Sequence, residues 1–90
     1  SPAYKDFLEF RRMKAQILDG KDVDIDALIY SNPGYYHTYV LAGDQEYRNK
    51  NYDLALGYYM TAATKEVATK IEEAYIIKRI LKCEKKKLNG

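Results

Sequence analysis

Apolar residues recur at helical spacing in four long stretches of the chain, which are separated by short polar or glycine-containing breaks. The first stretch predicts a helix from the N-terminus to Asp19, with Ser1 as its cap, Pro2 in its first turn and Gly20 as its stop. Its apolar stripe consists of Tyr4, Phe7, Leu8, Phe10, Met13, Ile17 and Leu18.

A charged loop follows this helix and leads into a short helix of about two turns through residues 27–30, which Asp24 or Asp26 can cap. The alternation of Asp22, Asp24 and Asp26 also suggests calcium binding. An EF-hand loop, however, needs a central glycine and a final glutamate that are missing here. We therefore interpret the loop as a helix cap within a solvated acidic turn.

The next two stretches predict an antiparallel helical hairpin. Its first helix covers residues 33–48, with Asn32 as cap and Pro33 in the first turn. Its second helix covers residues 52–66 and follows the polar turn 49–51, where Asn51 can act as cap. The facing stripes are Tyr36, Tyr39, Val40, Gly43 and Tyr47 on the first helix, and Tyr52, Ala55, Leu56, Tyr59, Ala62 and Ala63 on the second.

The last stretch predicts a helix that begins at the capping box Thr69-Lys70-Ile71-Glu72. We expect its apolar residues to face the core: Ile71, Ala74, Tyr75, Ile77, Ile80 and Leu81. We expect its basic residues to form a solvated outer face: Lys78, Arg79, Lys82, Lys85, Lys86 and Lys87.

Small residues along the hairpin predict a close helix–helix contact. Gly43, Ala55 and Ala62 would let the two backbones approach, and tyrosines would fill the space beside them, namely Tyr39, Tyr52 and Tyr59. Together these patterns predict an all-α fold of stacked helical hairpins, with four long helices and one short helix in a single domain over residues 1–90.

The hairpin resembles a tetratricopeptide (TPR) repeat, whose period is about 34 residues. The resemblance rests on the spacing of Tyr39, Gly43, Tyr47, Tyr52, Ala55, Tyr59 and Ala62. The chain departs from the family pattern in three places: Ala42 stands where Leu is usual, Val67 replaces the closing Pro, and the first aromatic of the turn is shifted to Tyr47.

In repeats of this kind the first helix of each hairpin lines a concave groove that takes extended peptides. By position, the resemblance implies that the groove side carries His37, Val40, Leu41, Asp44, Tyr47 and Arg48. Tyrosine, arginine and histidine there would clasp a peptide backbone or carboxylate. The alternative is that the same face is buried by the N-terminal helix or by a neighbouring domain.

From Tyr30-Ser31-Asn32-Pro33 to its end, the chain also looks like the helical C-terminal region of some bacterial proteins similar to isopenicillin N acyltransferases. The leading hypothesis from this resemblance is an accessory, non-catalytic domain of a larger enzyme, whose partner is its own catalytic domain. The abrupt start of the chain within a helical pattern also favours a fragment. The alternative is a stand-alone adaptor that binds a protein or peptide in its groove.

Composition argues against several other classes of function. A net charge of +2 gives no case for nucleic acid, and no apolar run is long enough to span a membrane. The chain has one histidine, His37, and one cysteine, Cys83, which leaves no metal-ligand spacing and few nucleophile–base pairs. We expect no cofactor, no metal and no catalysis by this chain.

Overall fold

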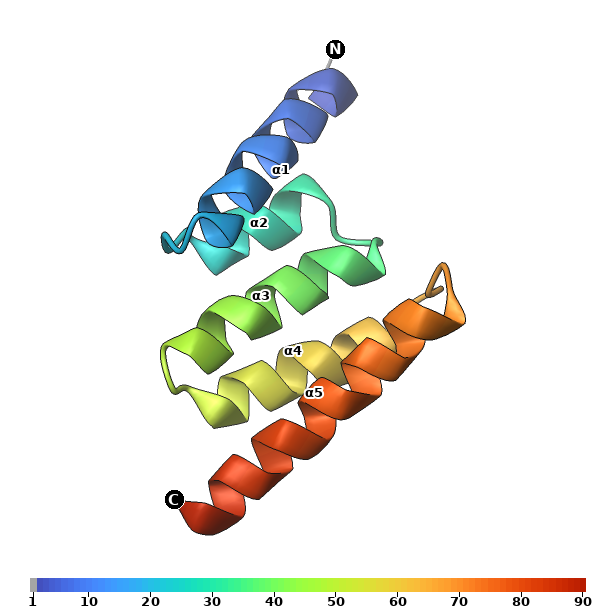
Figure 1. Cartoon of the computed structure of the whole chain (residues 1–90). Helices are drawn as coiled ribbons and strands as arrows, with labels where there is room; N and C mark the ends of the chain where they lie inside the picture. The colour runs from blue at the N-terminus through green and yellow to red at the C-terminus, as the bar shows by residue number, and fades with distance from the viewer. Residues whose placement is uncertain (1) are drawn as a thin grey trace.

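The computed structural model describes residues 2–90, and in that range the regular secondary structure is all helical, without a strand. The helices are α1 (Pro2–Leu18), α2 (Ile25–Ser31), α3 (Tyr36–Arg48), α4 (Tyr52–Ala63) and α5 (Lys70–Asn89). Successive helices lie side by side in a stack of 46 × 27 × 18 Å, and the two termini lie at opposite ends of it (Figure 1). This confirms the predicted all-α helical-hairpin fold, with four long helices and one short one.

Helix α1 ends, and helix α2 begins, close to where the sequence indicates. Gly20, the second residue after α1, has a left-handed φ of 81°, which is the usual role of a glycine at a helix C-terminus. Asp24, rather than Asp26, caps α2, because its Oδ1 accepts hydrogen bonds from the backbone N–H groups of Asp26 and Ala27. The cap predicted at Ser1 lies outside the described residues.

The predicted start of α3 was wrong. The helix begins at Tyr36 instead of Pro33, and Asn32 lies at the C-terminus of α2, where it does not cap α3. The physical reason is a competing set of hydrogen bonds: the Thr38 hydroxyl donates to the carbonyl oxygen of Asn32 and the Tyr39 hydroxyl to that of Pro33. These bonds hold residues 32–35 as a turn.

The turn between α3 and α4 also differs in detail from the prediction. Asn51 does precede α4, but its side chain makes no cap. Its Nδ2 instead donates to Glu46 Oε2 at 2.8 Å. At the other end, α4 stops at Ala63 rather than Glu66, and the Thr64 hydroxyl donates to the carbonyl oxygen of Thr61 there.

The Thr69 half of the predicted capping box is confirmed, because the Thr69 hydroxyl accepts from the Glu72 N–H. The Glu72 carboxylate accepts from the Thr69 hydroxyl at 3.0 Å instead of from the Thr69 backbone. The predicted inward face was largely wrong, however. Ile71 is 84% exposed and Leu81 61%, whereas Ile76 and Cys83 are buried. Two apolar stripes run along α5, and the one containing the small Cys83 faces α4, where it packs beside Ala55 and Tyr59. Of the other residues expected inside, Ile80 is half-buried while Ala74, Tyr75 and Ile77 are exposed.

The core is divided into three apolar clusters along the stack. The first joins α1, α2 and α3, and contains Phe10, Met13, Ile17, Leu28, Leu41 and Ala42. The second joins α3 to α4 and α5, and contains Tyr36, Tyr39, Val40, Ala62 and Ile76. The third contains Ala55, Tyr59 and Cys83 between α4 and α5. Helix α3 therefore packs with one face against α1 and α2, and with another against α4 and α5.

Candidate functional site

The contact between α3 and α4 is closest at Gly43. A Cβ atom placed on Gly43 would lie 2.6 Å from Cε1 of Tyr59, closer than real carbon contacts allow. The Tyr59 side chain is completely buried, so moving its ring aside would disturb the packing around it. Glycine at this position therefore lets the ring lie against the α3 backbone and brings the Tyr59 hydroxyl to Asp44, the next residue along α3.

Asp44 is the centre of a polar cluster formed by three helices. Its Oδ1 accepts hydrogen bonds from the hydroxyl of Tyr59 on α4, at 2.5 Å, and from that of Tyr75 on α5, at 3.2 Å. Arg79 of α5 donates from Nε to the Tyr59 oxygen at 3.1 Å, and the same Nε lies 3.8 Å from Asp44 Oδ1. The cluster ties α3, α4 and α5 together.

Arg79 does not belong to the solvated basic face on which it was predicted. Its side chain is only 17% exposed, and its guanidinium carbon lies 4.1 Å from the centre of the Tyr47 ring. The rings of Tyr59 and Tyr75 are also within 6 Å of it. Cation–π attraction and the Asp44 charge together compensate for removing the guanidinium from water.

The tyrosines of this cluster remain protonated donors at neutral pH. Burial, followed by the hydrogen bond to Asp44, raises the pKa of Tyr59 far above its ordinary value of 10. Burial and then the charge of Asp44 raise the pKa of Tyr75 as well. Both hydroxyls therefore keep the proton that they donate to Asp44.

A pocket of about 330 Å³ opens beside this cluster, between α3 and the first turns of α5. It is lined by Tyr36, His37, Val40, Asp44, Ile71, Glu72 and Tyr75. Three residues predicted for the groove, His37, Val40 and Asp44, are therefore brought together on one wall. His37 is half-buried, and its pKa is lowered from 6.5 by burial and then by the nearby charge of Lys14.

The other three residues predicted for the groove lie elsewhere. Leu41 is 1% exposed in the cluster formed with α1 and α2. The Arg48 guanidinium binds the last turn of α1 and the loop after it. Its Nη1 donates to the carbonyl oxygen of Ile17 at 3.0 Å, and its Nη2 reaches Asp22 Oδ1 at 2.8 Å. Tyr47 lies beneath Arg79 rather than in the pocket.

Sequence reasoning missed the α5 wall of the pocket. Ile71 and Tyr75, which line the pocket, are four residues apart and so share one face of α5, which would have been a usable signal. The signal was obscured because the same helix carries a second apolar stripe, which includes Ile77 and Leu81.

The residues predicted for helix–helix contact lie along the α3–α4–α5 packing. Ala55 and Ala62 are fully buried. The Tyr52 ring meets that of Tyr47 edge-on, with the ring centres 5.2 Å apart. Tyr39 is mostly buried, and Lys65 lies over its ring.

Within residues 2–90, no group of three or more potential metal ligands comes together. Cys83 is buried, and burial raises the pKa of its thiol. Across the same described range, no helix combines the length and apolar character needed to cross a bilayer.

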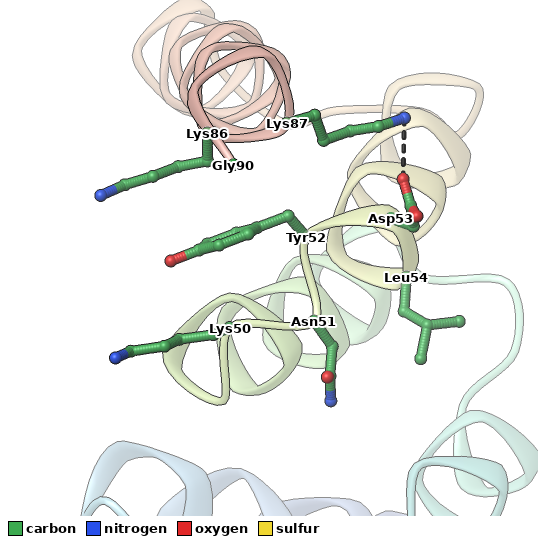
Figure 2. Close-up of a pocket in the computed structure, with 8 residues that line it drawn as sticks. All are labelled: Lys50, Asn51, Tyr52, Asp53, Leu54, Lys86, Lys87 and Gly90. Atoms are coloured by element: carbon green, nitrogen blue, oxygen red, sulfur yellow. Dashed lines mark ion pairs between the residues drawn. The ribbon is translucent and has the colours of Figure 1, made fainter.

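A second, more open hollow of about 460 Å³ lies between the start of α4 and the end of α5. Figure 2 shows Lys50, Tyr52 and Lys86 extending toward the same side of it, while Lys87 turns to Asp53 and pairs with it at 2.8 Å. Lysines in the last turn of a helix complement its dipole and keep it solvated. We therefore regard this hollow as part of the solvated basic face.

Comparison with protein-family models found no match, and neither did comparison with curated proteins or with solved structures.

Proposed function

We propose that the chain is a non-catalytic helical interaction module that holds an extended peptide segment in the pocket between α3 and α5. The main support for this proposal is the pocket itself, which is lined by residues of both helices. His37, Val40 and Asp44 come from α3, and Ile71 and Tyr75 come from α5. Apolar walls with a few convergent polar groups are the usual composition of a binding site.

The rigidity of the pocket walls supports this function. Asp44 and Tyr75 belong both to the pocket and to the polar cluster centred on Asp44, so their side chains are held before any ligand arrives. Preformed walls reduce the entropy that binding must overcome.

The TPR likeness supports the same location. In a TPR-like array, the first helix of one hairpin and the first helix of the next line the groove together. Helices α3 and α5 would hold these two positions, and the Gly43–Tyr59 contact would correspond to the close packing within a repeat.

The test is selection of binders from a phage-displayed library of random peptides on the purified chain. Ile71→Asp should strongly reduce capture of the enriched peptides, because Ile71 lines the pocket. Leu88→Asp is the matched control, since Leu88 is an equally exposed apolar residue of α5 outside the pocket, 88% exposed against 84%. Equal capture by both variants would contradict the proposal.

A second function, packing against another folded domain, is favoured by the outer stripe of α5. Ile77, Leu81 and Leu88 are between 50% and 88% exposed there. An acyltransferase-like parent protein remains a prediction of the sequence resemblance. Under this second proposal, Leu81→Asp would weaken the affinity for the rest of the parent chain, whereas Ile71→Asp would not.

A further inference from the structure

The charges that line the α3–α5 pocket have one sign. Asp44 and Glu72 both contribute carboxylates, and among the described residues no lysine or arginine lines the pocket. Arg79, outside the lining, pairs with Asp44 through Oδ1 and balances part of its charge. His37 is the remaining titratable base, and its lowered pKa keeps it neutral at pH 7. Lys14 lies near His37 but does not line the pocket.

Asp44 uses only one of its two carboxylate oxygens inside the protein. Tyr59, Tyr75 and Arg79 all contact Oδ1. Among the described residues no fully buried side-chain oxygen lacks a hydrogen-bond partner, so Oδ2, which has none, keeps some exposure to solvent. The Asp44 side chain is 30% exposed and lines the pocket. A fixed carboxylate thus presents a free acceptor to whatever enters.

The walls around this acceptor suit a long side chain with a charged end. Val40 and Ile71 are aliphatic, and Tyr36 and Tyr75 present aromatic surface. Lysine and arginine side chains place their methylene groups on such surfaces while the charged head reaches a polar partner. Aromatic rings also attract the cationic head itself.

We propose that the segment bound in this pocket is anchored by a lysine or arginine side chain, whose ammonium or guanidinium group binds Oδ2 of Asp44, with Glu72 adding a second negative charge. This inference rests on the function proposed above and specifies its ligand. It replaces the peptide carboxylate expected from sequence, because Arg48 is engaged with the α1–α2 loop and Arg79 is enclosed by tyrosines.

The experiment uses four pentapeptides, acetylated at the N-terminus and amidated at the C-terminus, with Lys, Arg, norleucine or Glu at the centre of four alanines. Each is titrated into the isotopically labelled chain, and the backbone amide shifts of His37, Val40 and Tyr75 are followed. We expect the Lys and Arg peptides to bind at least about tenfold more tightly than norleucine, as one charge-assisted hydrogen bond implies. The Glu peptide should bind most weakly.

Asp44→Asn should remove the preference for Lys over norleucine, while its amide oxygen still accepts from Tyr59. Asp53→Asn is the charge-matched control and should keep the preference, because Asp53 lies outside this pocket. Should Asp44→Asn fail to fold, ionic strength provides the second measurement. Added salt should weaken binding of the Lys peptide and leave the norleucine peptide nearly unchanged.

Equal binding of the Lys and norleucine peptides at the pocket would overturn this inference and leave the proposed function standing. Absence of shifts at His37, Val40 and Tyr75 with every peptide would count against both. A norleucine peptide with a free N-terminus that binds as tightly as the blocked Lys peptide would also overturn the inference, because the cation would then be a chain terminus.

Discussion

The stack has two halves, one formed by α1, α2 and α3 and the other by α3, α4 and α5. Each half is held together by different contacts, and α3 belongs to both. On one side, α3, α4 and α5 are joined by backbone approach at Gly43, by the buried Tyr59 and by the Asp44–Arg79 cluster. On the other side, α1 and α2 pack on α3 through one apolar cluster. Side chains of α3 reinforce that second contact by binding the backbone of the loop before α2.

Gln45 and Arg48 provide this reinforcement. Gln45 accepts from the Val23 N–H and donates to the Val23 carbonyl oxygen, both at 2.9 Å. Arg48 donates to the carbonyl oxygens of Ile17 and Lys21. Polar side chains of α3 therefore stabilise the contacts on both of its sides. Asp44 binds residues of α4 and α5, whereas Gln45 and Arg48 bind the end of α1 and the loop before α2.

The largest effect is expected from Tyr59→Ala. This change empties a fully buried site and removes the hydroxyl shared by Asp44 and Arg79, so we expect a loss of about 3–5 kcal/mol in the free energy of unfolding. Urea denaturation followed by circular dichroism measures it. A loss below about 1 kcal/mol would show that the contacts of Tyr59 do not stabilise the fold.

Gln45→Ala should destabilise the half formed by α1, α2 and α3. It leaves the backbone N–H and carbonyl of Val23 without partners, which should cost about 1–3 kcal/mol. Hydrogen exchange should quicken in α1 and α2 and change little in α4 and α5. Gln16→Ala, which removes only a surface contact with Arg12, should change stability by less than about 0.5 kcal/mol. Uniform quickening along the whole chain would contradict a division into two halves.

The smallest expected effect is the pH dependence of stability that His37 contributes. The pKa of His37 lies below 6.5 because burial disfavours its charged form. The folded chain therefore binds this proton less tightly than the unfolded chain does. The contribution of His37 to stability is complete above pH 6.5 and is lost as the pH falls from 6.5 toward the lower pKa of the folded state.

An NMR titration of the His37 ring measures this pKa directly. Asp44→Asn should lower it further, because the Asp44 charge favours the protonated imidazole. An unchanged or raised value in that variant would contradict the position of Asp44 beside His37.

The sequence predicted the number of helices and their type, because periodic stripes and strong caps such as Asp24 and Thr69 act locally. It also indicated Gly43 as a point of close approach. The sequence-based prediction failed where contacts with residues distant in the sequence determine the local structure. The turn at Asn32 and Pro33 depends on hydroxyls from α3, and the rotation of α5 depends on how Cys83 fits beside Tyr59.

Half of the candidate site was predictable from the TPR resemblance. That resemblance placed His37, Val40 and Asp44 on one side of α3, where all three line the pocket. The opposite wall depends on which stripe of α5 faces inward. The burial of Arg79 is favourable only because three tyrosine rings and one carboxylate surround it, and no local pattern shows that arrangement.

The most direct test of the account is the pair Gly43→Ala and Gly57→Ala. Both glycines lie within helices, but a Cβ on Gly43 would meet the Tyr59 ring at 2.6 Å, whereas one on Gly57 would meet nothing within 4 Å. Denaturation should show Gly43→Ala destabilised by about 1–3 kcal/mol and Gly57→Ala stabilised by about 0.5–1 kcal/mol. Stabilisation by both substitutions would contradict the close contact of α3 with Tyr59, and with it the placement of Asp44 in the pocket.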